Sequence, residues 1–207
     1  MRLASHNSWS FLPPLHWWQR MLSFTAKCQR LSISEQLEAG VTCFDLRLFY
    51  NKHQQQMELR HGIFVYCRQY SILFYLRFLN SYAGAAGQKL YVRVLLEQNS
   101  ISKDQELIER QFVAFCTNII SRFTNLIFFY GLRKFDNKVV YPFKDNIDLP
   151  IMELYSSVTT ISGPQSHKWY ARLDDLFPRL YAFLHNKHLL NKYRDAPVTL
   201  MLDFIKK

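Results

Sequence analysis

Residues 32–47, SISEQLEAGVTCFDLR, contain a complete helix signal followed directly by a strand signal. Ser32 and Glu35 form a capping box, which predicts a short helix, and Gly40 suits its C-terminal cap. The next residues, 41–49, are rich in β-branched and aromatic side chains and predict a strand. A helix that leads directly into a strand favours an α/β fold with parallel strand pairing.

The same alternation continues along the rest of the chain. Apolar stretches predict further strands at residues 1–6, 57–61, 90–96, 126–132, 150–155 and 198–205. Residues 70–79 are apolar on most sides and predict a buried helix. Helices are also predicted over residues 102–123, capped by Ser102 and Gln105, and over residues 169–193, where Pro178 breaks the helix or starts a new segment. These strands and helices predict an α/β fold: a small, distorted (β/α)8 barrel of the TIM type, in a single domain of residues 1–207.

The composition limits the possible partners. The chain has 26 Lys and Arg against 16 Asp and Glu, a formal net charge of +10. This charge attracts polyanions such as nucleic acids, anionic membrane surfaces or phosphorylated substrates. The basic residues are scattered without a long run, which argues against nucleic acid. We therefore expect a protein that acts on a phosphorylated substrate or at an anionic membrane surface. A monomer is expected as well.

Hydrophobic residues make up 49% of the 207 residues, enough for one large core. The four cysteines stand far apart without a C-x-x-C pair, so we expect buried free thiols rather than disulfides. They are Cys28, Cys43, Cys67 and Cys116. No apolar run reaches the ~18 residues of a membrane span, and no signal peptide is visible. A soluble protein is expected, and secretion and residence in the cytoplasm both stay open.

Reactive side chains stand in three of the expected strands. His6 ends the first, Asp45 and Arg47 lie two residues apart in the next, and His61 ends another, before Gly62. Histidines transfer protons near neutral pH, and a guanidinium can hold a phosphoryl oxygen as its charge grows. We expect these side chains to meet at one rim of a parallel sheet and to act on a phosphodiester. A structural ion pair between Asp45 and Arg47 is compatible with this role, because both point to one face.

Three motifs occur in a fixed order: S-H-N-S at residues 5–8, E-Q-L-E-A-G-V-x-x-F-D-L-R at residues 35–47, and H-G at residues 61–62. This set resembles the catalytic X region of the phosphatidylinositol-specific phospholipases C, in particular the bacterial enzymes. The similarity is densest over residues 3–62 and can be traced to the C-terminus. It implies a distorted (β/α) barrel that cleaves phosphatidylinositol, or a related lipid, into diacylglycerol and cyclic inositol phosphate.

The resemblance implies catalytic roles for five residues. His6 corresponds to the general base, which takes the proton from the inositol 2-hydroxyl. His61 corresponds to the general acid, which protonates the departing diacylglycerol oxygen. Arg47 corresponds to the arginine that stabilises charge on the phosphorus, and Asp45 to an acidic residue beside it. Asp203 corresponds to the aspartate that orients His6, although it could also merely cap the final strand.

The resemblance also implies a set of substrate-binding residues. Glu153 and Tyr155 resemble an acid and a tyrosine that bind inositol hydroxyls and stack under the ring, with Glu153 standing where the family usually has aspartate. Arg133 is implied as a further inositol contact, and Asn7 and Glu97 complete the set. Glu97 has a second interpretation, as a solvated residue at a strand end.

A calcium site is the alternative to a metal-free mechanism. Asn7 stands where many bacterial members have aspartate, whereas calcium-dependent eukaryotic members have an asparagine ligand there. Asn7, Asp45 and Glu97 therefore form an alternative set of calcium ligands. Arg47, however, stands where those members place a further acid, and a guanidinium repels a cation. We therefore expect no cofactor.

Two other functions stay open. Asn7 and Glu153 favour a catalytically weakened relative that binds inositol lipids on membranes. The third hypothesis is another phosphodiesterase of the same fold that acts on glycerophosphodiesters, although the start of such barrels does not match S-H-N-S. Trp17 and Trp18 are expected either in the core or, with nearby basic residues, in contact with anionic lipid.

Overall fold

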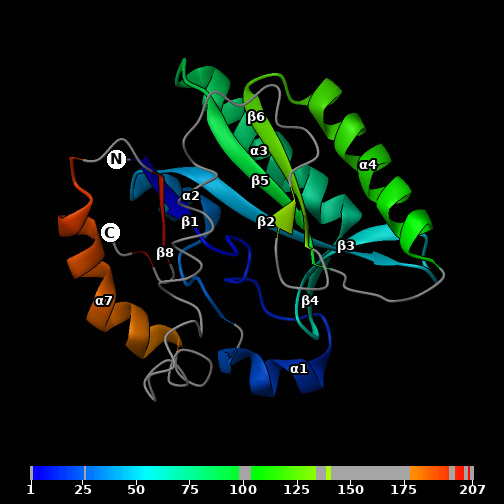
Figure 1. Cartoon of the computed structure of the whole chain (residues 1–207), viewed down its shortest axis with the longest axis horizontal. Coiled ribbons are helices and arrows are strands. Elements are labelled where there is room, and N and C mark those ends of the chain that lie inside the picture. Colours follow the sequence, from blue (N-terminus) through cyan, green and yellow to red (C-terminus); the bar gives the residue numbers. More distant parts are fainter. Residues whose placement is uncertain are drawn as a thin grey trace. The chain divides into compact units, whose positions relative to one another are not determined.

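The computed structural model describes residues 2–25, 27–97, 104–133, 139–140, 178–195, 199–202 and 205. The chain divides into two compact units (Figure 1). The first contains Met1–Phe44 and Ile147–Lys207, and the second contains Asp45–Asn146.

The first unit is built around strand β1 (Arg2–Ser5). β1 pairs in parallel with β8 (Thr199–Leu202) and with the start of β2 (Val41–Asn51). Its described helical elements are α1 (Trp17–Leu22), the 3₁₀ turn η1 (Ser23–Thr25), α2 (Ile33–Glu38) and α7 (Pro178–Lys192). Parallel pairing in this unit agrees with the prediction from the sequence.

The predicted capping box of α2 is confirmed. The Ser32 hydroxyl accepts from the Glu35 backbone N–H, and the Glu35 carboxylate accepts from the Ser32 backbone N–H at 2.8 Å. After the helix, Gly40 has φ +84°, a left-handed conformation that glycine adopts without a steric penalty. The two caps fix where the helix ends and therefore where β2 begins.

The second unit contains a sheet in the order β4-β3-β2-β5-β6-β7. Besides β2, the strands of this sheet are β3 (Gln56–His61), β4 (Phe64–Arg68), β5 (Leu90–Leu96), β6 (Leu126–Arg133) and β7 (Val139–Val140). β5 and β6 are parallel, whereas the β2–β3, β3–β4 and β6–β7 pairs are antiparallel. Helices α3 (Gln69–Ala85) and α4 (Gln105–Arg122) pack on this sheet.

The expectation of parallel pairing was wrong for β2 and β3. Only residues 52–55 separate these strands, and so short a link permits a hairpin but no crossover. Gln55 has φ 50°, as a tight turn requires. The prediction also missed β4, whose five residues run directly into α3 without a breaking residue.

Other predictions from the sequence have mixed outcomes. The helix expected at residues 70–79 exists as the longer α3, but it is not buried on most sides, because Tyr70 and Phe74 are exposed. The four cysteines are free and buried, as expected. Within the described residues, α4 begins after Asp104. The expected cap at Ser102, the strand at residues 150–155 and residues 169–177 of the last helix lie outside the described part.

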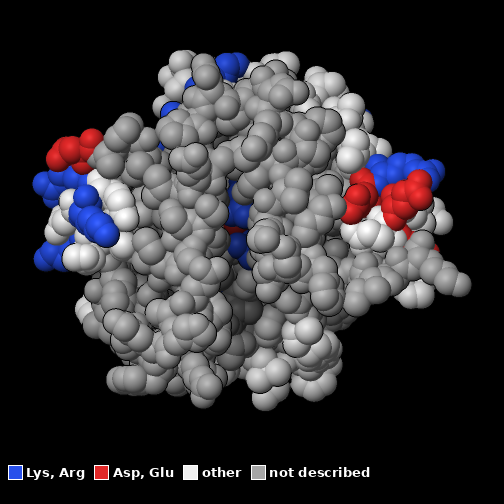
Figure 2. Space-filling model, viewed as in Figure 1, with Lys and Arg blue, Asp and Glu red and all other residues white. Residues whose placement is uncertain are grey.

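Described charged side chains lie in several separate places on the face shown in Figure 2. Described basic side chains lie over α7 and beside α4, and those beside α4 are interleaved with acidic ones. The latter group includes the ion pairs Lys52–Asp104 and Arg110–Glu106. On this face the described residues therefore form no continuous basic patch of the kind that binds nucleic acid. No helix in the described ranges is both long and apolar enough to cross a bilayer.

Candidate active site

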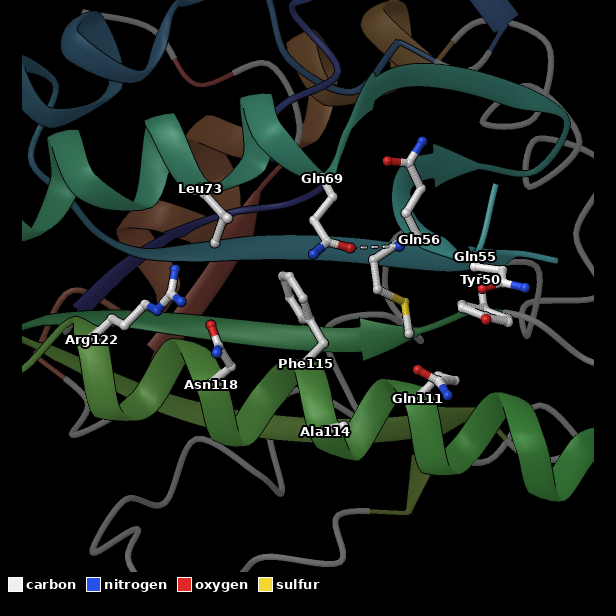
Figure 3. Close-up of a pocket in the computed structure, with 11 residues that line it drawn as sticks. Tyr50, Gln55, Gln56, Gln69, Leu73, Gln111, Ala114, Phe115, Asn118 and Arg122 are labelled. Carbon is white, nitrogen blue, oxygen red and sulfur yellow. Dashed lines mark hydrogen bonds between the residues drawn. The ribbon is translucent and has the colours of Figure 1, made fainter. Parts of the chain in front are cut away.

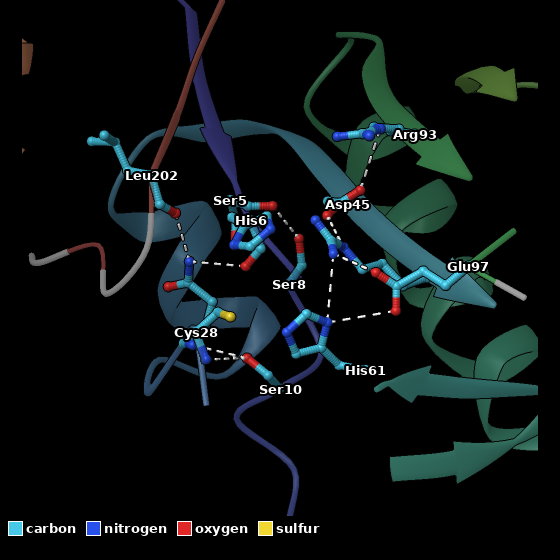
Figure 4. A network of polar contacts seen from close by, with 12 residues as sticks. Ser5, His6, Ser8, Ser10, Cys28, Asp45, His61, Arg93, Glu97 and Leu202 are labelled. Carbon is cyan, nitrogen blue, oxygen red and sulfur yellow. Dashed lines mark hydrogen bonds and ion pairs between the residues drawn. The ribbon is translucent and has the colours of Figure 1, made fainter. Parts of the chain in front are cut away.

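Five charged or titratable side chains of the second unit form one connected group, here called the Arg47 cluster (Figure 4). Its members are Asp45, Arg47, His61, Arg93 and Glu97. Asp45 and Arg47 alternate with the buried Leu46 and Leu48 along β2 and therefore share one face of the sheet. Arg93 lies in the neighbouring β5 and Glu97 directly follows that strand, so adjacent strands bring these four residues together.

Arg47 lies at the centre of the cluster. Its Nε donates to Asp45 Oδ2 at 2.8 Å, and its Nη1 donates to Glu97 Oε1. The Arg47 side chain is only 3% exposed, and those of Asp45 and Glu97 are 0% and 8% exposed. Since two carboxylates bind different nitrogens of one planar guanidinium, the orientation of Arg47 is fixed before any ligand binds.

The hairpin brings His61 back to this group. Leu48 pairs with Leu59 in the antiparallel β2–β3 register, so His61 returns alongside the stretch that holds Asp45 and Arg47. Its Nδ1 lies 3.5 Å from Glu97 Oε2 and 3.5 Å from Arg47 Nη1. The sequence predicted a meeting with Asp45 and Arg47, which is confirmed, but at a rim of parallel strands, which was wrong.

His61 is the accessible member of the cluster, with 28% of its side chain exposed against 8% or less for its two contacts. A carboxylate at Nδ1 can hold the proton on that nitrogen and so direct proton exchange to Nε2. The cluster therefore holds a guanidinium and a proton-transfer group next to each other.

Arg93 is a cluster member that sequence reasoning missed as a functional residue. Its Nε lies 3.6 Å from Asp45 Oδ1, and its side chain is 2% exposed. The available signal was one arginine inside the otherwise apolar stretch Leu90–Leu96. Asp45 therefore contacts both Arg47 and Arg93. The two carboxylates and the two guanidinium groups of the cluster carry equal and opposite charge, so each buried charge has a partner.

His6 and Asn7 belong to the first unit, in the turn that follows β1. The His6 backbone N–H donates to the Leu202 carbonyl at 3.1 Å, which ties this turn to the end of β8. Asn7 is buried and has φ 42°, a left-handed conformation that asparagine tolerates better than most residues. The Ser8 hydroxyl donates to the Ser5 carbonyl at 2.8 Å and closes the turn.

Gln29 is a second residue that sequence reasoning missed, and it holds the His6 turn in place. Its Nε2 donates to the carbonyls of His6 and Leu202, at 3.2 and 2.8 Å. Its Oε1 accepts from the Ile205 backbone N–H at 3.3 Å. The Ser10 hydroxyl in turn accepts from the Gln29 backbone N–H at 2.8 Å. This fully buried amide therefore joins the His6 turn to the end of β8.

The other predicted site residues fall outside what the structure describes. Asp203, Glu153 and Tyr155 lie outside the described residues. Arg133 ends β6, and its side chain is likewise undescribed. Their implied roles stay predictions.

A separate cavity of about 290 Å³ lies in the second unit between α3, α4 and the β2–β3 hairpin (Figure 3). Its lining is rich in amide side chains, and Gln69 Oε1 accepts from the Met57 backbone N–H at 3.0 Å. The amides are Gln55, Gln56, Gln69, Gln111 and Asn118. The ionisable side chains of the lining are Tyr50 and Arg122, and no member of the Arg47 cluster belongs to it, so this cavity is separate from the cluster.

Helix α1 presents apolar side chains to solvent. Trp17 is 73% and Trp18 45% exposed, Met21 is also exposed, and the exposed Phe24 follows in the 3₁₀ turn η1. The interpretation of Trp17 and Trp18 as core residues was therefore wrong. Large exposed apolar groups clustered on a short helix mark a binding surface.

Comparison with solved structures identifies the fold. A phosphatidylinositol-specific phospholipase C from Listeria monocytogenes matches 99% of this chain and 88% of its own, with a TM-score of 0.57 and 14% sequence identity. A variant of the phosphatidylinositol-specific phospholipase C from Staphylococcus aureus matches 98% of this chain and 84% of its own, with a TM-score of 0.63 and 14% identity. This chain has the fold of the bacterial phosphatidylinositol-specific phospholipases C.

A second Staphylococcus aureus structure, with pentafluoro-Phe incorporated, agrees: its TM-score is 0.61 and its identity 14%, over 98% of this chain and 85% of that one. No protein-family model and no curated protein matches the sequence. The α/β fold related to the TIM barrel, and the resemblance drawn from S-H-N-S, D-L-R and H-G, are thus confirmed at the level of the fold.

Proposed function

We propose that this protein is a phosphodiesterase that cleaves phosphatidylinositol, or a closely related lipid, into diacylglycerol and cyclic inositol phosphate. The observation that carries the proposal is the Arg47 cluster, in which a fixed guanidinium and a partly exposed imidazole both contact the Glu97 carboxylate. The fold shared with phosphatidylinositol-specific phospholipases C supports the same activity.

In the proposed reaction the inositol 2-hydroxyl oxygen attacks phosphorus while His6 takes its proton. The bond between phosphorus and the glycerol oxygen breaks, and His61 gives a proton from Nε2 to that oxygen, which leaves as diacylglycerol. Arg47 binds a phosphoryl oxygen whose negative charge grows in the transition state. Asp203 orients His6, as a triad carboxylate does.

We assign Glu97 two tasks, to fix Arg47 and to orient His61 through Nδ1. A carboxylate that accepts from His61 Nδ1–H fixes the orientation of the ring and leaves Nε2 to face the leaving group. Asn7, Arg133, Glu153 and Tyr155 are proposed to bind the substrate, as the resemblance implies.

We propose that the reaction needs no metal ion. Asp45 and Glu97 are the carboxylates of the alternative calcium set, and both already bind the Arg47 guanidinium. Asp45 also contacts Arg93. A cation bound by these oxygens would face two positive groups, so this donor set fits a metal poorly.

We further propose that α1 docks the enzyme on an anionic membrane. Trp17 and Trp18 would insert at the lipid headgroups, where indole rings are favoured. Arg20 on the same helix and Lys27 beyond it supply positive charge. Burial and the neighbouring Arg30 lower the pKa of Lys27. Anionic lipid beside this side chain would raise its pKa again, because a nearby negative charge favours the ammonium form.

The test is cleavage of phosphatidylinositol vesicles in excess chelator by the wild type and by His6→Ala and His61→Ala. We expect turnover in chelator that both substitutions abolish. Turnover only with calcium would instead make Asn7, Asp45 and Glu97 metal ligands. Vesicle binding without turnover in either condition would support an inositol-lipid-binding module. Activity confined to glycerophosphodiesters would place the protein among other phosphodiesterases of this fold.

A further inference from the structure

Helix α3 carries a row of aromatic side chains on the side that does not pack on the sheet, here called the aromatic ridge. Its members are Tyr70, Phe74, Phe78 and Tyr82, which are 83%, 61%, 39% and 38% exposed. They stand four residues apart and therefore form one continuous ridge about 18 Å long. The opposite side of α3 is buried in the core through Ile72, Leu76, Leu79 and Ala83.

The ridge is unusual for a surface helix of a soluble unit. Single exposed apolar side chains are common, but four aromatic ones in one row form the kind of patch that marks an interface. Residues 69–85 contain no acidic side chain and one basic one, Arg77. The ridge therefore offers almost no ion pairs to a strongly charged partner, which favours an apolar one. Helix α1, by contrast, has Arg20 beside its exposed tryptophans.

We infer that the aromatic ridge binds the same ridge of a second copy of this chain, with the two α3 helices antiparallel. Rows of side chains at four-residue spacing pack between each other in the commonest class of helix contact. The ridge reads Tyr-Phe-Phe-Tyr in both directions, so antiparallel packing sets Phe74 against Phe78 and Tyr70 against Tyr82 of the other copy. An isologous interface requires this self-complementarity, and antiparallel helix dipoles favour it.

The exposed area fits a weak dimer. The exposed fractions of the four side chains amount to about two whole aromatic side chains, or roughly 400 Å² per copy. Both copies together would bury about 800 Å² from the ridge alone, and neighbouring side chains raise this toward the ~1,000 Å² at which specific interfaces begin. The association is therefore reversible and depends on protein concentration.

The experiment is sedimentation equilibrium of the full chain over roughly 10 to 500 μM. We expect the average mass to rise from 24.8 kDa toward twice this value as concentration increases. The double variant Phe74→Glu/Phe78→Glu should stay monomeric, and Phe74→Ala/Phe78→Ala should shift the midpoint to higher concentration. The matched control Leu107→Glu/Ile120→Glu, which places the same charges at exposed apolar positions of α4, should dimerise like the wild type.

Cross-linking tests the orientation. A mixture of Tyr70→Cys and Tyr82→Cys proteins should form mainly the mixed disulfide if the helices are antiparallel, and the native cysteines, all buried, should not compete. A wild type that stays monomeric throughout, or an α4 control that also loses the dimer, would overturn the inference. A monomer whose vesicle binding is lost in the Phe74→Glu/Phe78→Glu variant would assign the ridge to lipid instead.

Discussion

Glu97 Oε2 lies 3.5 Å from His61 Nδ1, while the other oxygen of the same carboxylate binds Arg47. One side chain thus orients both the proposed proton donor and the proposed phosphate ligand. Of the two carboxylates in the cluster, Glu97 is therefore the one that contacts His61 and can support it as the proposed general acid.

This arrangement makes Glu97→Gln the most informative substitution in the cluster. The amide is nearly isosteric but removes the negative charge, so we expect kcat on phosphatidylinositol to fall about 100-fold. The loss should shrink on an inositol phosphodiester with an acidic phenol as leaving group, since such a group departs without a proton. Glu106→Gln, at an exposed position of α4, is the control. An equal loss on both substrates would contradict the link to proton donation.

Arg47→Lys tests the guanidinium itself. An ammonium group is a point donor and cannot bind both carboxylates in the same plane, so one of them loses its partner. We expect kcat to fall by about 100-fold or more at unchanged fold, because charge stabilisation at phosphorus is lost. Circular dichroism and steady-state kinetics on vesicles measure the two effects separately. Near-wild-type turnover in Arg47→Lys would remove this residue from the mechanism.

Arg93→Met should destabilise the second unit, because it leaves the fully buried Asp45 with one positive neighbour fewer. We expect a loss of about 2 kcal/mol in the free energy of unfolding, measured with urea. Adding Asp45→Asn removes the charge that Arg93 compensates, so the double variant should be more stable than the sum of the two single effects predicts. Strict additivity would show that the 3.6 Å contact contributes nothing.

Local signals explain which parts of the fold could be predicted. The capping box of α2 and the apolar run of β5 are encoded within a few residues, and both elements occur where expected. The antiparallel pairing of β2 and β3 depends on the length of the loop between them, which the expectation of parallel strands did not take into account. Gln29 contacts Leu202, 173 positions away, so no pattern near Gln29 could reveal its role.

The buried thiols give a prediction about pH. Burial raises the pKa of Cys67 from its ordinary 9.0 to about 12 and also raises the pKa of Cys116. These thiols ionise more readily in the unfolded chain, which therefore loses protons first as pH rises. The contribution of these thiols to folding stability should be constant below about pH 9 and decline from there toward pH 12. Urea unfolding across this range measures the decline, and serine at both positions should reduce it.

Gln29→Leu tests the link between the His6 turn and β8. Leucine matches the size of glutamine but leaves the His6 and Leu202 carbonyls and the Ile205 N–H without this partner. We expect a loss of about 3 kcal/mol in the free energy of unfolding. The exposed Gln88→Leu is the matched control and should change stability by less than about 0.5 kcal/mol. Where Gln29→Leu still folds, its kcat should also fall, because the backbone that carries His6 is no longer held in place. Unchanged kcat in a destabilised variant would restrict Gln29 to a structural role.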